Sequence, residues 1–217
     1  MKKYLYNNGL SIVFLSMFAV TIVCQVVTGF SEYNKDREEQ GHSAVPLRGY
    51  LASGHFIEAT FENWESEFLQ MGLFVLLTIS LRQKGSSESK SCDGPDEVDR
   101  EPSPKRKGAP WPVRKGGIIL AVYKNSLTIA LFALFVASFA LHLYGSLKDE
   151  NEKLLLKGKP PEGLGDFLGE SRFWFESFQN WQSEFLSVFA IIVLSIYLRQ
   201  KGSSQSKPVD AGNEETI

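Results

Sequence analysis

Residues Phe61–Lys90 read FENWESEFLQMGLFVLLTISLRQKGSSESK, and residues Phe178–Lys207 repeat that stretch as FQNWQSEFLSVFAIIVLSIYLRQKGSSQSK. The two copies lie 117 residues apart and are identical at 18 of 30 positions. Each copy passes from an aromatic and acidic segment, through an uninterrupted apolar stretch, into a basic Arg-Gln-Lys-Gly exit. This order is typical of a helix that enters and leaves a lipid bilayer. The copies therefore predict a duplicated membrane protein.

Averages over the whole chain hide this pattern. The chain has 217 residues, a formal net charge of -2 and a mean hydropathy of -0.11, which are the values of an ordinary soluble domain. The apolar residues nevertheless gather in four runs, with most charges between them: Leu10–Val27, Phe68–Leu81, Leu127–Leu141 and Phe185–Leu198. Such segregation favours membrane spans.

Three of the four runs are short for a bilayer. Runs of 14 or 15 residues make about 21 Å of helix, whereas the hydrocarbon core is about 30 Å thick. Extending each run into its flanks predicts spans at about 10–28, 64–82, 125–144 and 181–199. The alternative, buried helices of a soluble protein, is disfavoured by the basic residues at the ends of the runs.

The first run also has features of a secretory signal or a signal anchor, because Lys2 and Lys3 precede it. Its 18 residues exceed the usual signal core, and no small-x-small cleavage site follows. The segment has a counterpart at the same displacement of 117, with these matches: Tyr6 with Tyr123, Asn8 with Asn125 and Leu10 with Leu127. A cleaved signal would not be duplicated in the middle of a chain, so we predict a retained span.

The displacement of 117 persists from Tyr6 to Lys90, so the duplicated unit is a whole helical hairpin with its loop. We predict an all-α membrane protein whose four transmembrane helices form two tandem parallel hairpin repeats. Its predicted parts are hairpin repeat 1 at 1–90, a flexible cytoplasmic linker at 91–117, hairpin repeat 2 at 118–207 and a disordered tail at 208–217. Because each hairpin has two spans, both copies enter the membrane from the same side.

The basic residues predict the orientation. Of the 23 Lys and Arg residues, 15 lie in the N-terminal segment, the central connection and the tail. Four of these stand at predicted helix ends, where we expect them to act as cytoplasmic anchors: Arg82, Lys84, Arg199 and Lys201. Because Lys and Arg accumulate on the cytoplasmic side of a membrane, both termini are expected in the cytoplasm.

An aromatic face precedes each copied span. Its residues have helical spacing: Ile57, Phe61, Trp64 and Phe68 in the first copy, and Trp174, Phe178, Trp181 and Phe185 in the second. Because such rings favour the headgroup level, we expect a short amphipathic interfacial helix in each outer loop, turning into the span near Trp64 or Trp181. Alternatively, the aromatic residues only pack the end of their own hairpin.

The candidate functional polar residues are Glu67 and Glu184, which occupy equivalent positions in the two copies. A carboxylate near membrane depth normally faces a partner, a water-filled cleft or a proton path. Gln25 and His142 are also equivalent and lie near the outer end of the preceding span, so each is expected to approach the glutamate of its own hairpin. The alternative is that both glutamates cap exposed amides in a first helical turn.

The motif Phe-x-Asn-Trp-x-Ser-Glu-Phe-Leu, followed by a span and by Leu-Arg-Gln-Lys-Gly-Ser-x-x-Ser-Lys, resembles a family of uncharacterised bacterial integral membrane proteins classed as a domain of unknown function. The resemblance extends from about Tyr4 to Lys207, apart from the linker. It implies a multi-pass protein of the bacterial cytoplasmic membrane. It implies no reaction, so no catalytic residue is assigned from it.

The sequence favours a non-catalytic role. It contains no phosphate-binding glycine loop, His-Glu-x-x-His motif or nucleophile elbow. The three histidines lack metal-ligand spacing, and Cys24 and Cys92 are expected on opposite sides of a membrane boundary. We therefore expect no enzyme activity, metal or cofactor, and no nucleic-acid partner. Membrane lipid, a homo-oligomer or a membrane protein partner is expected instead, the alternative being a small transporter or channel that uses Glu67 and Glu184.

Overall fold

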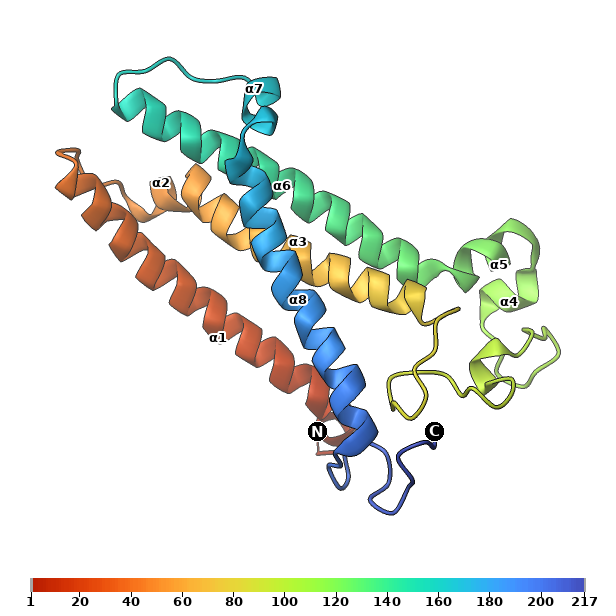
Figure 1. The fold of residues 1–217 in the computed structure, drawn as a ribbon. Helices are drawn as coiled ribbons and strands as arrows, with labels where there is room; N and C mark the ends of the chain where they lie inside the picture. The colour runs from red at the N-terminus through yellow and green to blue at the C-terminus, as the bar shows by residue number, and fades with distance from the viewer. Residues whose placement is uncertain (1, 217) are drawn as a thin grey trace. The chain divides into compact units, whose positions relative to one another are not determined.

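The computed structural model describes residues 2–216, and no strand occurs among them. The side chain of Lys2, one of the basic residues used above for orientation, lies outside the described side chains. The helices in chain order are α1 (Lys2–Glu39), α2 (Leu47–Leu51), α3 (Gly54–Leu77), the 3-10 turn η1 (Glu97–Asp99), α4 (Trp111–Lys115), α5 (Gly117–Lys124), α6 (Ser126–Leu156), α7 (Leu164–Gly169) and α8 (Ser171–Tyr197) (Figure 1). The prediction of an all-helical protein is confirmed.

Three of the described helices are long and apolar enough to cross a membrane: α1 over Lys3–Glu39, α6 and α8. The helix α3 is not among them, although it has 24 residues. Two differences from α8 account for this: the last 18 residues of α3 contain Glu62, Glu65 and Glu67, and α3 ends three positions before the equivalent end of α8. At the displacement of 117, Glu62 and Glu65 correspond to the uncharged Gln179 and Gln182. Of the four predicted spans, three correspond to helices whose length and composition allow a crossing, and the fourth, in α3, stays a prediction.

The helix ends follow the copied sequence. Three pairs of bounds each differ by 117 residues: the ends of α1 and α6 at Glu39 and Leu156, the starts of α2 and α7 at Leu47 and Leu164, and the starts of α3 and α8 at Gly54 and Ser171. The C-terminal ends of the last pair differ, because α8 continues to Tyr197 whereas α3 ends at Leu77.

The helix α3 ends five residues before the position 82 that the sequence predicted for this span. The hydroxyl of Thr78 donates to the carbonyl of Phe74 at 2.9 Å. The amides of Ile79 and Ser80 donate to carbonyls three residues earlier in the chain, at 3.3 Å and 3.2 Å. Such tightening satisfies the last carbonyls of a helix and stops its propagation.

Both outer loops are held by the same side-chain clip. In the first loop, the amide of Asn34 donates to the carbonyl of Val45 at 3.1 Å and its oxygen accepts the amide of Val45 at 2.7 Å. In the second, Asn151 makes the same two bonds to Glu162, at 3.1 Å and 2.7 Å. The asparagine therefore imitates a backbone partner and fixes the path of each loop.

A glycine in the left-handed region follows each long helix. Gly41 has a φ of 80° just after α1, and Gly158 has a φ of 69° just after α6. Glycine adopts this conformation without steric strain because it lacks a Cβ. The amide of Gly41 donates to the carbonyl of Glu38 at 2.9 Å, and the amide of Gly158 donates to the carbonyl of Leu155 at 3.0 Å. These glycines explain why α1 and α6 stop at equivalent positions.

The aromatic faces do not form separate interfacial helices. The sequence predicted a turn near Trp64 or Trp181, but α3 and α8 pass through these residues as continuous helices (Figure 1). No proline or glycine interrupts α8, and the first glycine of α3 after Gly54 is Gly72, so the backbone has no reason to break there. The short helices of the outer loops are α2 and α7 instead.

The chain forms two compact units. Unit 1 comprises Met1–Phe61 and Leu141–Glu170, and unit 2 comprises Glu62–Ala140 and Ser171–Ile217. Each unit therefore contains residues of both sequence copies.

The core of unit 1 is built around Tyr50 of α2, whose exposed fraction is 2%. Its ring lies 5.3 Å from that of Phe56, 5.5 Å from Tyr33 and 5.8 Å from Phe30, as measured between ring centroids. Phe167 of α7, which is equivalent to Tyr50 at the displacement of 117, is completely buried. One aromatic anchor thus seats each outer-loop helix.

Within unit 1, α3 and α6 approach closely at two glycines. A Cβ added to Gly54 would collide with the backbone of Asp149, and one added to Gly145 would lie 2.9 Å from the Cα of Glu58. Real Cβ atoms do not tolerate such contacts with backbone. The side chain of Lys148 also donates to the carbonyl of Ala52 at this crossing. Small residues permit this approach, which provides van der Waals contact where lipid surrounds helices.

We predict that Gly145→Ala lowers the free energy of unfolding by about 1–3 kcal/mol, because the added methyl group forces the two backbones apart. Thermal unfolding of the purified protein in detergent measures this loss. Gly9→Ala in α1 is the matched control, since no atom lies within 4 Å of a Cβ at that position and alanine favours a helix by about 1 kcal/mol over glycine. Equal stability of the two variants would contradict the crossing described here.

Candidate functional site

Polar side chains are concentrated in the buried part of the described protein. The buried apolar residues are Tyr50, Leu69, Leu131, Phe167 and Phe173. The buried polar or charged residues are more numerous: Ser53, Glu58, Thr60, Glu65, Ser66, Ser86, Ser138, His142, Ser146, Asp149, Ser177, Ser195 and Lys207. A buried polar group needs a partner, so these residues mark the places where side chains of different helices interact.

A polar cluster joins α3 to α8 inside unit 2. The carboxylate of Glu65 is completely buried and accepts a hydrogen bond from the indole N–H of Trp181 at 2.8 Å. One helical turn earlier, the carboxylate of Glu62 accepts a hydrogen bond from the side-chain amide of Asn180. Glu62 and Glu65 share a face of α3 because they are three residues apart. The two carboxylates therefore bind two neighbouring donors on α8.

The carboxylates of this cluster occur in the first copy only. At the displacement of 117, Glu62 and Glu65 correspond to Gln179 and Gln182, so the second copy has no carboxylate at these positions. Sequence reasoning missed both residues because it selected positions that the copies share. The signal that would have identified them is the opposite one, a change from glutamate to glutamine within an otherwise matched motif.

The structure places the predicted polar residues in different units. In unit 2, Glu67 on α3 is exposed and Glu184 on α8 is half-buried. In unit 1, Gln25 donates to the hydroxyl of Thr60 at 3.3 Å, and His142 is completely buried. The expected approach of Gln25 to Glu67 and of His142 to Glu184 joins the two units and stays a prediction.

The alternative role of the glutamates as helix caps is wrong. Capping requires a position in the first turn of a helix. The helices begin at Gly54 and Ser171, so Glu67 and Glu184 each lie 13 residues inside a continuous helix. The sequence suggested a cap because an asparagine precedes each glutamate, but the helix had already begun three turns earlier.

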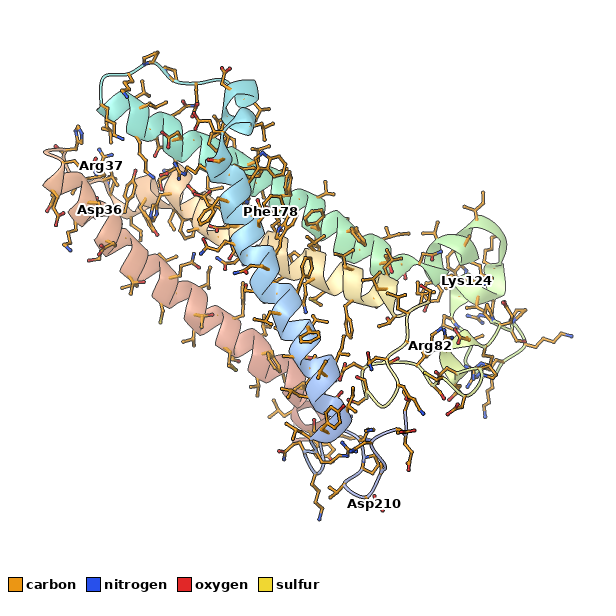
Figure 2. The ribbon with its side chains drawn as sticks, in the orientation of Figure 1. Asp36, Arg37, Arg82, Lys124, Phe178 and Asp210 are labelled. Carbon is orange, nitrogen blue, oxygen red and sulfur yellow. The ribbon has the colours of Figure 1, made fainter. Side chains whose placement is uncertain are left out.

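The aromatic residues of α8 form a contact ladder. Trp174 and Phe178 stack with ring centroids 6.1 Å apart, and Phe178 meets Trp181 edge-on at 5.5 Å. Trp181 also contacts Phe135 of α6 at 6.5 Å. Phe178 is labelled on α8 in Figure 2, and its exposed fraction is 56%.

The other predicted interfacial residues are on α3. Phe61 and Trp64 are half-buried, and Trp181 is half-buried in α8. Of these four aromatic residues, Phe178 is the most exposed, and the interfacial placement stays a prediction. The indole N–H of Trp181 also donates a hydrogen bond to the carboxylate of Glu65.

The predicted arginine anchors hold the chain segments that follow α3 and α8. Beyond α3, the guanidinium of Arg82 donates to the carbonyls of Ser91 at 3.2 Å and Ser80 at 3.3 Å (Figure 2). The equivalent Arg199 donates to Ile196 at 3.0 Å at the end of α8, and to Ala211 at 2.9 Å in the tail. Arginine suits this role because its fork carries five donors.

The predicted lysine anchors differ from each other. The ammonium group of Lys84 lies 2.6 Å from the carboxylate of Glu214, and this hydrogen bond holds the pKa of Glu214 below its usual value. Conversely, the same contact raises the pKa of Lys84. Lys201, its equivalent in the second copy, is exposed. The tail is thus attached to the exit of the first copy.

The exit loops of the two copies touch each other in unit 2. The hydroxyls of Ser86 and Ser195 lie 2.9 Å apart, and Ser87 donates to the carbonyl of Gln205 at 3.0 Å. Lys207, which is 2% exposed, donates to three carbonyls of the tail, including that of Glu215 at 2.9 Å. Serine hydroxyls and a buried lysine therefore tie the two exits and the tail into one polar junction.

Unit 2 also contains a groove of about 600 Å³, which we call the exit groove. Its walls come from α3, α8 and the segment after α3: Gln70, Leu73, Phe74, Leu77, Thr78, Leu81, Arg82, Gln83, Glu88, Ser89, Phe185, Val188, Phe189 and Ile192. The walls are mostly apolar, and the charged groups stand at the end formed by the exit loop. An apolar body with a few polar groups is the usual composition of a ligand site.

We predict that Glu65→Leu lowers the free energy of unfolding by about 1–3 kcal/mol, because it leaves the indole N–H of Trp181 without this acceptor. Glu65→Gln retains an oxygen acceptor and is expected to lose less. Thermal unfolding in detergent measures both.

The matched control is Gln182→Leu, which makes a similar change at the equivalent, exposed position of α8. A loss in this control as large as that of Glu65→Leu would contradict a specific role for the buried carboxylate.

The chain belongs to the family described as Domain of unknown function (DUF6766), whose profile matches residues 1–217. No curated protein and no solved structure matches the chain. The sequence-based resemblance is therefore confirmed at the level of a family of unknown function.

Proposed function

We propose that this chain is a non-catalytic protein of the bacterial cytoplasmic membrane that acts through contact with membrane lipid or with a protein partner. Two tandem hairpins cross the bilayer four times in this proposal, with both termini in the cytoplasm. Membership of the family, helices of membrane length and the exit groove support it.

The observation that carries the proposal is that large apolar side chains are exposed while polar side chains are buried, the reverse of a water-soluble protein. On α1, the exposed fractions are 75% for Leu10, 62% for Phe14 and 62% for Val20. Polar side chains such as Ser146 and Asp149 are buried at the same time. In water, each large apolar side chain that stays exposed loses the roughly 1.5–3 kcal/mol of stabilising free energy that its burial would provide. Lipid removes this cost, so the inversion favours a bilayer as the solvent.

A fourth span through α3 is supported by its length and by its paired carboxylates. Its 24 residues extend about 36 Å, which exceeds the hydrocarbon thickness of about 30 Å. Carboxylates inside a membrane require partners, and Glu62 and Glu65 have them in Asn180 and Trp181 of α8. The acidic residues that make α3 less apolar are thus compatible with a crossing.

A parallel arrangement of the hairpins is supported by the junction of the exit loops. The contact between Ser86 and Ser195 requires the end of α3 and the end of α8 to lie on the same side of the membrane. Both ends carry arginine and lysine, so the cytoplasmic side is favoured for them.

Thiol labelling tests the topology, because Cys92 lies exposed in the linker. In a Cys24→Ser background, we expect a membrane-impermeant maleimide to leave Cys92 unlabelled in intact cells and to label it after permeabilisation. Without Cys92, single cysteines introduced as Ser43→Cys and Lys159→Cys are expected to react in intact cells, because these exposed positions lie in the two outer loops.

A protein with only three spans gives a different result. If α3 does not cross, Cys92 lies on the same side as position 43 and is labelled together with it, while position 159 is protected. That pattern would refute the four-span proposal. A protein that stays monomeric and dispersed without detergent would refute the membrane location as well.

The second candidate is a small transporter or channel that uses Glu67 and Glu184. It is favoured by the matched positions of the two carboxylates, which lie on α3 and α8 of the same unit. Paired carboxylates near membrane depth suit a cation or proton path.

For this candidate, we expect ion flux in proteoliposomes to fall at least tenfold in the double variant Glu67→Gln, Glu184→Gln. Asp210→Asn, an exposed change in the tail, is the control and retains the flux. Absence of flux in the unmodified protein would reject transport and leave the contact role as the proposal.

A further inference from the structure

The walls of the exit groove between α3 and α8 are mostly apolar, with Gln70 and Thr78 as the polar side chains of α3 and its last turn. Leu73 and Leu77 of α3 face Val188 and Ile192 of α8 across it. The hydroxyl of Thr78 is already used by a backbone carbonyl, at 2.9 Å. Because apolar walls gain free energy only by contact with apolar groups, a hydrocarbon chain is the chemistry that fits this body.

The groove is accessible from the outer surface of the helices. The exposed fraction is 47% for Leu77, 43% for Phe185 and 61% for Phe189, and all three line the groove. In a bilayer, such walls face lipid and not water, so an acyl chain enters them from the side.

The length of the groove corresponds to one membrane leaflet. From Gln70 to Leu77, α3 contributes seven steps of about 1.5 Å, or roughly 10 Å, and the turn residues up to Leu81 extend the wall further. One leaflet contributes about 15 Å of hydrocarbon. A chain lying in the groove therefore brings its headgroup to the level of Arg82.

The rim carries two opposite charges, those of Arg82 and Glu88. Two donations from Arg82, to the carbonyls of Ser91 and Ser80, orient its guanidinium. A guanidinium has five donors, so it can also bind a phosphate. Glu88 presents a carboxylate that accepts a hydrogen bond from the hydroxyl of Ser87 at 3.4 Å. A carboxylate binds ammonium groups but repels further anions.

The second copy lacks this pair of charges. At the displacement of 117, Arg82 corresponds to Arg199 and Glu88 corresponds to Gln205. Arg199 is committed to carbonyls of α8 and of the tail, and Gln205 carries no charge. The combination of a cation and an anion on one apolar groove thus belongs to the first copy alone.

We infer that the exit groove binds one acyl chain of a zwitterionic amine phospholipid, with the phosphate on Arg82 and the ammonium group on Glu88. Phosphatidylethanolamine has this chemistry. An anionic headgroup without an amine, such as phosphatidylglycerol, satisfies Arg82 but faces repulsion from Glu88. The inference rests on the proposed membrane location and deepens the proposed contact with lipid.

The test is a count of retained lipid by native mass spectrometry. The delipidated protein in detergent is titrated separately with phosphatidylethanolamine and phosphatidylglycerol. The unmodified protein is expected to retain one phosphatidylethanolamine with about tenfold preference, which corresponds to about 1.4 kcal/mol. Glu88→Gln is expected to remove the preference, and Arg82→Gln to weaken retention of both lipids about tenfold. Leu73→Trp fills the groove and abolishes retention.

Lys201→Gln is the matched control, because it removes a positive charge from an exposed exit position outside the groove; it leaves both retention and preference unchanged. Thermal unfolding confirms that each variant is folded. Equal retention of the two lipids by the unmodified protein, or an unchanged preference in Glu88→Gln, overturns the inference alone. A protein that retains neither lipid and disperses without detergent overturns the proposed function too.

Discussion

A helix that crosses a bilayer must satisfy its polar groups within the protein, because lipid supplies no hydrogen bonds. The buried carboxylate of Glu65 on α3 has such a partner in the indole N–H of Trp181 on α8. In the proposed topology, this contact inside unit 2 offsets the cost of placing a carboxylate at membrane depth. The proposed crossing of α3, and with it the proposed position of the exit loop that follows, depends on this pairing.

The two sequence copies share local structure but differ in their contacts. Asn34 and Asn151 clip the two outer loops with the same pair of hydrogen bonds, because the backbone problem is the same in both copies. The copies differ where helices meet other helices. Position 65 is glutamate in the first copy, and the equivalent position 182 is glutamine in the second. The exit of the first copy has Arg82 and Glu88, whereas the exit of the second copy has Arg199 and the uncharged Gln205. A symmetric sequence thus supports an asymmetric interior.

The sequence predicted the helical class and the approximate position of each long helix, but not the helix ends, and it predicted the site only partly. Hydrophobic runs locate the apolar part of a helix, whereas α1 and α6 continue through polar residues almost as far as Gly41 and Gly158, which end them locally. The bend expected near Trp64 does not occur, because interfacial preference alone does not break a continuous helix. Glu65 was missed for another reason: its significance comes from Trp181, which lies 116 positions later in the chain.

The sequence by itself determined the helical class, the 117-residue repeat, the basic exits and membership of a family without an assigned reaction. These properties depend on composition and on spacing along one segment. Only the tertiary structure decided that Glu65 is buried against Trp181, that Gly145 lies at a helix crossing, and that Arg82 and Glu88 share one groove. These contacts form between segments that are distant in the sequence. The periodicity of one helix does not indicate which side chains of another helix pack against it.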